Sequence, residues 1–343
     1  MTRNGAIGVP TEVLVAPDSF KGTFSAAAAA VAQALARGLA ASGQPAQLCP
    51  VADGGEGTLA ALADALGLEQ VRAQTSDPLG RELEAGFGLA PGGVAVVEMA
   101  AASGLSLVAE QQRDAVAASS YGTGELIAAA LEAGAGTVYV AAGGSATTDG
   151  GEGAVRALAE RGGLRGARLV VLCDVRTPFE LAPATFAPQK GASPEQVRTL
   201  ERRLDRLAAK LPRDPRGLPM TGAAGGLAGG LWSHFGAELV SGASFVLSAV
   251  GYDARMRAAR AVLTGEGRLD RQSLVGKIVS EVATRARQAG VPCHAVVGSL
   301  ALDLFDLRIL DLQLVLEAST LAELEAAGAQ LGAAIREQSA RGA

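Results

Sequence analysis

The chain has 343 residues, of which 49% are hydrophobic and only 3% aromatic, and its formal net charge at pH 7 is −5. At about 150 residues per domain this length allows two domains, and an aliphatic, aromatic-poor composition favours helices packed on a parallel sheet. The negative charge excludes a broad basic surface for nucleic acid or an anionic membrane, so an anionic ligand must be bound by a local group of cations.

Several kinds of site are disfavoured by the few histidines and cysteines. Cys49, Cys173 and Cys293 are far apart and form no CxxC pair, so we expect buried free thiols rather than disulfides or a zinc site. Only His234 and His294 are available for Ser-His-Asp or Cys-His catalysis. Carboxylates, lysines, arginines and backbone amides must therefore carry the chemistry.

The N-terminus lacks the apolar run of a secretory leader, because Gly5, Pro10, Glu12 and Asp18 interrupt it. No later segment reaches about 18 apolar residues, the length of a membrane span. We therefore expect a cytoplasmic protein without membrane contact.

Strands and helices alternate at the start of the chain. A strand at 12–16 precedes a helix over 26–41, which Ser25 is expected to cap and Gly43 to end. A second strand at 47–52 leads into a helix that stops at Gly67.

The middle of the chain is different, because strands at 82–89 and 94–98 are joined by a tight Pro-Gly-Gly turn, which indicates a hairpin. A helix follows near 124–133, then a strand at 137–141 and a helix near 153–161. Ser193, Pro194 and Gln196 predict the start of another helix with a capping box.

Alternation returns near the C-terminus. Strands are predicted at 261–263, 294–297 and 313–316, with helices at 275–289 and after Thr320. This pattern is typical of a parallel sheet with right-handed crossovers. We predict an α/β protein with two domains: a Rossmann-like parallel-sheet domain from both chain ends (1–75 with 255–343) and an inserted α/β domain (76–254).

In open parallel sheets, ligands bind beyond the carboxyl ends of the strands. Four loops at such positions join small residues to acids or cations: APDSFKG (16–22), ADGGEGT (52–58), GGSATTDGG (143–151) and TGEGRLD (264–270). Glycines let a backbone approach phosphate closely, and amides at a following helix N-terminus donate to it. GGSATTDGG fits this role best, with Asp149 as a Mg²⁺ ligand directly or through water, although the loop is also compatible with a plain strand-to-helix turn.

The first loop combines an acid, a hydroxyl and a cation in Asp18, Ser19 and Lys21, which suits the hydroxyl and carboxylate of a hydroxy acid. Asp53 and Glu56 add acids if the first two strands are neighbours. Each of these acids also has an ordinary interpretation as a helix cap or first-turn charge.

Lysines are rare in this chain, and three of the four adjoin a glycine: Lys21, Lys190 and Lys277. A compact ammonium next to glycine is typical of phosphate sites, although chance in a glycine-rich chain explains it too. Neither a Walker A pattern nor GxGxxG is present.

Eight segments in chain order together resemble the type-1 glycerate kinase family: APDSFKG (16–22), PVADGGEGT (50–58), EMAAASGL (98–105), YGTGELI (121–127), GGSATTDGG (143–151), FAPQKGAS (186–193), GAAGGLAGGL (222–231) and TGEGRLDRQS (264–273). The resemblance spans nearly the whole chain. It implies a kinase that uses ATP and Mg²⁺ to phosphorylate D-glycerate, with 2-phosphoglycerate as the expected product and an active site in the cleft between the domains. This chain has Thr148 where the family usually has Asn, and it is shorter at 162–168 and 174–186.

For that reaction, Lys21 and Arg268 are expected to bind the carboxylate or the γ-phosphate, and Asp18 or Asp53 to accept the hydroxyl proton. Further substrate-binding residues are expected at Ser19, Gly54, Gly55, Glu56, Lys190 and Lys277. Nucleotide-binding residues are expected at Gly143, Gly144, Ser145, Thr147, Thr148 and Glu266.

Two other functions are compatible with these loops. A kinase for another small sugar acid would differ only in its acceptor pocket, and a non-catalytic protein that binds an anionic metabolite would need no catalytic acids. The expected partners are the small-molecule substrate and ATP, with the chain a monomer or a homodimer.

Overall fold

A computed structural model describes residues 11–22, 24–274 and 277–342. The chain forms two compact units: a terminal unit, Met1–Ala52 with Val250–Ala343, and a central unit, Asp53–Ala249. Gly5 and Pro10, which interrupt the N-terminal apolar run, and the expected helix start at 275 lie outside the described residues. No described helix is long and apolar enough to cross a membrane.

The unit boundaries correct the expected ones at 75/76 and 254/255. β3 (Glu69–Ser76) pairs antiparallel with β4 (Glu82–Leu89) over its full length, so the segment from Asp53 to β3 belongs to the central unit. No strand is predicted at β3 from the sequence, and the expected end of the first domain is therefore too late.

The terminal unit contains a parallel sheet of five strands in the described part of the chain, in the order β11-β10-β9-β1-β2. The parallel sheet predicted from the alternating pattern is confirmed, because every neighbouring pair runs parallel. Its strands are β1 (Val13–Pro17), β2 (Ala46–Leu48), β9 (Ala261–Glu266), β10 (Cys293–Val297) and β11 (Leu312–Glu317).

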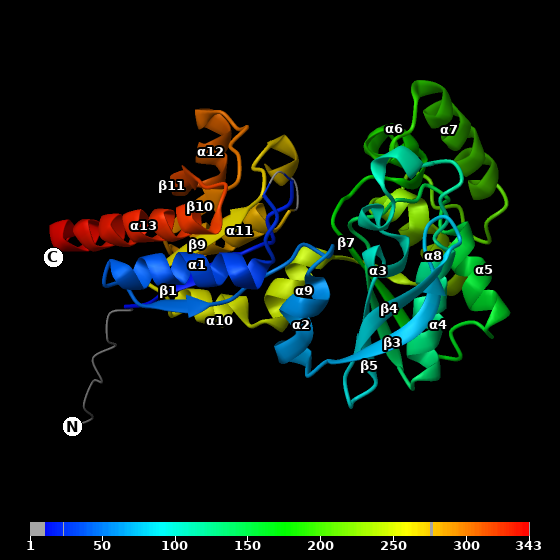
Figure 1. The fold of residues 1–343 in the computed structure, drawn as a ribbon, viewed down its shortest axis with the longest axis horizontal. Coiled ribbons are helices and arrows are strands. Elements are labelled where there is room, and N and C mark those ends of the chain that lie inside the picture. Colours follow the sequence, from blue (N-terminus) through cyan, green and yellow to red (C-terminus); the bar gives the residue numbers. More distant parts are fainter. Residues whose placement is uncertain (1–10, 23, 275–276, 343) are drawn as a thin grey trace. The chain divides into compact units, whose positions relative to one another are not determined.

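The helices of the terminal unit are α1 (Ala28–Ala41), α10 (Tyr252–Arg257), α11 (Ile278–Ala289), α12 (Leu304–Leu310) and α13 (Leu321–Gly342). α1 and α13 lie side by side (Figure 1) and pack with residues of β1, β9 and β10 in one core. Their approach depends on Gly38, where a Cβ atom would lie 1.9 Å from the carbonyl oxygen of Glu325. The predicted Ser25 cap is wrong, because α1 begins after Ala27 without a side-chain cap.

The central unit contains a mixed sheet of six strands among the residues described, in the order β3-β4-β5-β6-β7-β8. β4 and β5 form the predicted antiparallel hairpin, and the pairs from β5 to β8 are parallel. The strands after β4 are β5 (Val94–Glu98), β6 (Thr137–Ala141), β7 (Arg168–Cys173) and β8 (Glu238–Ser241).

Helices and short 3₁₀ turns connect these strands. The α-helices are α2 (Thr58–Leu66), α3 (Ala100–Ser103), α4 (Tyr121–Glu132), α5 (Glu152–Glu160), α6 (Ala182–Phe186), α7 (Pro194–Ala208), α8 (Leu227–Phe235) and α9 (Gly242–Ala249). α7 opens with the predicted capping box of Ser193 and Gln196, with Pro194 in its first turn. α2 ends at Gly67 in the left-handed conformation, as predicted.

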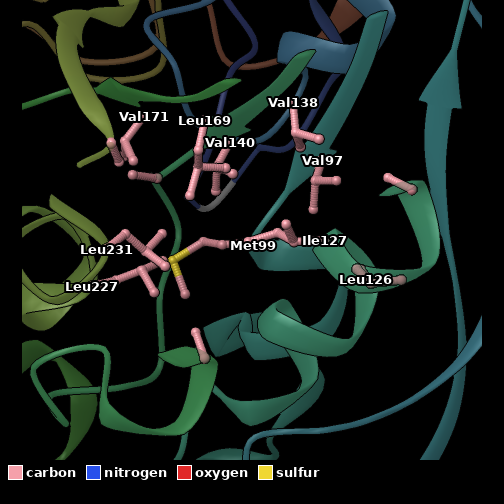
Figure 2. Packing of buried hydrophobic residues seen from close by; sticks show 14 of the residues in the cluster. Val97, Met99, Leu126, Ile127, Val138, Val140, Leu169, Val171, Leu227 and Leu231 are labelled. Atoms are coloured by element: carbon pink, nitrogen blue, oxygen red, sulfur yellow. The ribbon is translucent and has the colours of Figure 1, made fainter. Parts of the chain in front are cut away.

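A large hydrophobic cluster of the central unit lies on the face of its sheet that α4 and α8 cover. Valine and leucine side chains of β5, β6 and β7 point toward Ile127 of α4 and toward Leu227 and Leu231 of α8, with Met99 between the two layers (Figure 2). These side chains are buried, so β5, β6 and β7 are held in place by this packing. The loops that follow these strands contain most of the candidate site residues of this unit.

Candidate active site

In the terminal unit, two of the predicted loops meet at the carboxyl ends of β1 and β9. The two strands are parallel neighbours, and the amide of Asp18 donates to the carbonyl of Gly265 at 2.8 Å. Gly267 touches the other loop so closely that a Cβ atom there would lie 2.6 Å from the backbone nitrogen of Lys21. Loops 16–22 and 264–270 therefore form one surface, as expected for strand ends of a parallel sheet.

This surface combines buried acids with exposed cations. Asp18 is 7% exposed, and its carboxylate accepts hydrogen bonds from the amide of Ser19 at 2.6 Å and from its hydroxyl at 3.1 Å. Glu266 is also 7% exposed. Lys21 and Arg268 are exposed, and Arg268 lies 3.3 Å from the carboxylate of Asp270.

Lys277 stands at the N-cap of α11 and is half-buried. Its carbonyl accepts from the hydroxyl of Ser280 at 2.9 Å, which fixes the start of the helix. Substrate contact by Lys277 stays a prediction.

In the central unit, residues 53–57 lie against GGSATTDGG, which we call the glycine loop (143–151). The amide of Gly143 donates to the carbonyl of Gly54 at 3.2 Å, and a Cβ atom on Gly143 would lie 2.6 Å from the α-carbon of Gly55. Asp53 is half-buried and accepts from the amide of Gly55 at 3.0 Å, while Glu56 lies beside Gly144. Asp53 and Glu56 are thus neighbours of the predicted nucleotide loop.

Only part of the glycine loop reaches the surface. Gly144 is exposed and Ser145 half-buried, whereas Thr147 and Thr148 are fully buried, and neither hydroxyl has a hydrogen-bond partner in the described part of the chain. Because these two side chains are buried, they do not reach a ligand in this conformation. Within the glycine loop, Gly144 and Ser145 are therefore the candidates for nucleotide contact.

Asp149 caps the helix that follows the glycine loop. Its carboxylate accepts from the amide and hydroxyl of Ser120, both at 2.8 Å, and from the amides of Gly151 at 3.1 Å and Gly153 at 3.3 Å. At 1% exposure and with both oxygens accepting, this carboxylate is held by Ser120 and by the amides of its own loop. A structural role fits this geometry better than the metal-binding role expected from sequence.

Four other segments of the family pattern support the glycine loop from outside. The segment 98–105, which begins at the end of β5, makes two backbone hydrogen bonds with the glycine loop. The amide of Leu105 donates to the carbonyl of Gly144, and the amide of Ala146 donates to the carbonyl of Ser103, both at 2.9 Å. Ser120, which directly precedes the segment 121–127, donates to Asp149. Lys190, in the segment 186–193, donates to Ser145 and Thr147 of the glycine loop.

The fourth segment, 222–231, contacts the glycine loop by close backbone packing. Gly225 has φ +65°, and a Cβ atom there would lie 2.0 Å from the carbonyl oxygen of Thr147. The amide of Gly150 donates to the carbonyl of Gly225 at 3.0 Å. Much of the pattern therefore shapes one loop.

Lys190 is 2% exposed, and its ammonium donates to Ser145 Oγ at 2.9 Å and to the carbonyl oxygen of Thr147 at 2.5 Å. Burial lowers the pKa of Lys190 to about 8, and the nearby carboxylates of Asp149 and Asp174 act in the opposite direction. Lys190 therefore lies beneath the glycine loop.

Two acids at strand ends of the central unit, Asp174 and Glu98, were not predicted as site residues. Asp174 directly follows β7, and its Oδ2 would lie 3.2 Å from a Cβ atom on Gly143. Glu98 ends β5 and accepts from the amides of Gly57 at 2.9 Å and Leu59 at 2.8 Å, at the N-terminus of α2. The apolar run LVVLC before Asp174 was the signal for β7 and for this acid.

Across the described residues, no group of three or more His, Cys, Asp or Glu side chains is arranged to bind a metal ion. Mg²⁺ is commonly held by one or two carboxylates together with substrate phosphates, so a site shared with a nucleotide remains compatible with this chain.

Glycine-rich and charged loops at the carboxyl ends of parallel strands define an α/β protein built to bind small anionic ligands. A family model described as the glycerate kinase family matches residues 13–162 and 161–341. The chain therefore belongs to the glycerate kinase family, and it is an enzyme of the phosphotransferase class.

Curated relatives and a solved structure support this assignment. Glycerate kinase of Bacillus subtilis (strain 168) is 38% identical over 333 residues, covering 85% of this chain and 86% of the relative. Glycerate 2-kinase of Escherichia coli (strain K12) is 37% identical over 330 residues, covering 85% and 86%. The crystal structure of putative glycerate kinase 2 from Salmonella typhimurium LT2 matches with a TM-score of 0.77 and 32% identity, covering 96% of this chain and 99% of that one.

Proposed function

We propose that this enzyme phosphorylates D-glycerate with ATP, giving 2-phosphoglycerate and ADP. The observation that carries the proposal is the family match over nearly the whole chain, together with a charged loop pair at strand ends of the terminal unit. The names of the relatives support glycerate as acceptor, and that of the Escherichia coli relative supports the 2-position.

Phosphoryl transfer requires positioning of the acceptor hydroxyl and neutralisation of charge on the phosphate oxygens. Lys21 and Arg268 are exposed cations on one surface, so they are suited to the carboxylate or to the γ-phosphate. Gly144 and Ser145 are the surface residues of the glycine loop, so we assign them to phosphate oxygens of the nucleotide. Ser19 and Glu266 lie beside these cations. In this proposal Ser19 binds the acceptor, and Glu266 binds the nucleotide.

The general base in this proposal is Asp18 or Asp53. Asp53 is the more exposed of the two carboxylates, whereas Asp18 is 7% exposed and is held by Ser19. Either carboxylate accepts the hydroxyl proton as the oxygen attacks phosphorus.

Mg²⁺, when bound with ATP, supplies charge neutralisation on the phosphates. Residues that fit it are Glu56 and Asp174, because their carboxylates lie beside Gly144 and Gly143 of the glycine loop. Carboxylate oxygens next to a phosphate loop are the donor type that Mg²⁺ prefers.

The proposal is tested by measuring ATP consumption with and without glycerate and Mg²⁺, followed by a phosphorus NMR spectrum of the product. Phosphate on the 2-oxygen couples to one vicinal proton and gives a doublet, whereas phosphate on the 3-oxygen couples to two and gives a triplet. A triplet would contradict the proposed product, and consumption with another small sugar acid in preference to glycerate would contradict the substrate.

The base is identified by comparing Asp53→Asn with Asp18→Asn. Because a general base contributes typically about 10²- to 10⁴-fold, the variant that lacks it loses kcat by that factor, and we expect this for Asp53→Asn. Near-unchanged kcat in Asp53→Asn, with a loss of this size in Asp18→Asn, would transfer the role to Asp18.

A further inference from the structure

Lys190 is a buried cation that the proposed reaction does not use directly. Its ammonium has three N–H donors and no acceptor, and two of the donors are directed into the glycine loop, at Ser145 Oγ and at the carbonyl oxygen of Thr147. The cavity beside Lys190 measures about 10 Å³, which is about the volume that one water molecule needs and too small for glycerate or a phosphate.

Ser145 is partly exposed, so it links the buried Lys190 to the surface of the protein. A serine hydroxyl has one donor and two acceptor positions, so Ser145 Oγ can accept from the ammonium and still donate its own proton. Ser145 is half-buried and follows the exposed Gly144, so this proton is available to a ligand at the loop surface. Donation from a cation polarises the hydroxyl and strengthens it as a donor.

The second contact holds the opposite end of the same turn. The carbonyl of Thr147 accepts from the ammonium on one side, and Gly225 packs against the same oxygen on another. Lys190 thereby fixes both ends of the three-residue turn 145–147, and the segment 103–105 at the end of α3 bonds to its outer edge through Gly144 and Ala146.

The charged groups around Lys190 in the described part of the chain are Asp149 of the glycine loop, Asp174 at the end of β7, and Arg113 and Asp114 in the segment before α4. The two carboxylates favour the ammonium form, and burial opposes it. The ammonium form, with its charge shared by Ser145 and Thr147, is the one that the two hydrogen bonds require.

We propose that Lys190 is a positioning residue for the nucleotide: through Ser145 and Thr147 it holds the surface turn of the glycine loop in the shape that binds phosphate oxygens. This inference rests on the proposed function, since it takes the glycine loop as the nucleotide side of a kinase site. It assigns to Lys190 an action through the loop in place of the direct substrate contact expected from sequence.

The test uses the full chain and the substitution Lys190→Met, which keeps the length of the side chain and removes the ammonium. We expect KM for ATP and the Kd of a fluorescent ADP analogue to rise about tenfold or more, while KM for glycerate changes less than twofold. The matched control is Lys210→Met, because Lys210 is exposed just after α7, and both constants should stay as in the wild type.

Ser145→Ala provides the second variant, because it removes one acceptor from a half-buried side chain without leaving a large cavity. If Lys190 acts through Ser145, nucleotide binding weakens in Ser145→Ala, and the double variant binds no more weakly than the weaker single variant. Effects that multiply in the double variant would overturn the inference, as would an unchanged Kd in either single variant.

Folding is checked by circular dichroism and urea unfolding, and if Lys190→Met does not fold, Lys190→Gln takes its place in the comparison with Ser145→Ala and the double variant. A merely structural role predicts fewer active molecules with both KM values unchanged. A wild-type protein that fails to consume ATP with glycerate contradicts the proposed function, whereas an active wild type with unaltered nucleotide binding in the variants contradicts only this inference.

Discussion

Among the residues that the structure describes, each unit contains one buried basic side chain, and the two differ in their surroundings. Lys190 of the central unit is 2% exposed and donates to Ser145 and Thr147. His294 of the terminal unit lies on β10, opposite Leu263 of β9, and is 1% exposed. Neither of its ring nitrogens has a hydrogen-bond partner among the described residues.

The difference shows that burial alone does not identify a functional base. Lys190 has acceptors that use its charge, so keeping it protonated organises a loop. Burial lowers the pKa of His294 to about 4 and leaves the ring neutral at physiological pH. His294 is therefore a core residue whose polar ring atoms have no partners among the described residues. Partners at hydrogen-bond distance, rather than depth, separate the two cases.

The largest loss of stability is expected from Gly225→Ala, which disturbs the packing around the loop that Lys190 supports. The new Cβ atom would lie 2.0 Å from the carbonyl oxygen that accepts from Lys190, and φ is +65°. Left-handed strain costs about 1–2 kcal/mol and overpacking about 1–3 kcal/mol more, so unfolding free energy should fall by about 3 kcal/mol or more.

Gly67→Ala is the matched control, because Gly67 has φ +64° and nothing lies within 4 Å of a Cβ atom there. It should cost only the strain, about 1–2 kcal/mol in urea unfolding. Equal losses in the two variants would show that the backbone contact with Thr147 is unimportant.

A pH-dependent effect of intermediate size is expected from His294→Leu. The pKa of His294 is about 4 in the folded protein and about 6.5 when unfolded, so the unfolded chain takes up the proton first as pH falls. The folded state therefore loses stability as pH drops below 6.5, by about 2 kcal/mol at pH 5.

The unfolding free energy of the wild type should thus fall between pH 8 and pH 5 by about 2 kcal/mol more than that of His294→Leu. His234 is exposed, so His234→Leu should change the pH dependence less. Parallel curves for the wild type and His294→Leu would mean that a partner keeps His294 protonated in the folded protein.

The smallest effect is expected from Ser193→Ala, which acts on the segment that carries Lys190. Ser193 caps α7 by accepting from the amide of Gln196 at 3.3 Å, while the side chain of Gln196 accepts from the amide of Ser193. Losing the cap should cost about 1 kcal/mol of unfolding free energy, whereas Ser248→Ala on α9 should stay within about 0.5 kcal/mol.

Much of the fold was predictable because its signals are local. The hairpin of β4 and β5, the strand β6 and the start of α7 follow from turn residues, alternation and capping. β3 was missed because Glu69–Ser76 is mostly polar, with only Val71 and Ala73 apolar, and its pairing with β4 gives no local signal.

The site was only partly predictable. Loop positions follow from parallel strands, so Asp18 and Arg268 were placed on neighbouring strand ends, whereas the contact of residues 53–57 with the glycine loop was not predicted. Burial within a loop depends on packing from distant segments, so the burial of Thr147, Thr148 and Asp149 and the location of Lys190 beneath the loop needed the structure.

The order of strands in the terminal unit has a consequence for how the polypeptide matures on the ribosome. β1 pairs with β2 on one side and with β9 on the other, and the hydroxyl of Thr264 reaches the carbonyl of Ala16 across 248 positions. The central unit is continuous in sequence and can fold during synthesis, while one edge of β1 stays open until β9 emerges. A nascent chain stalled before β9 therefore displays an unpaired strand edge, which is a template for pairing with other chains.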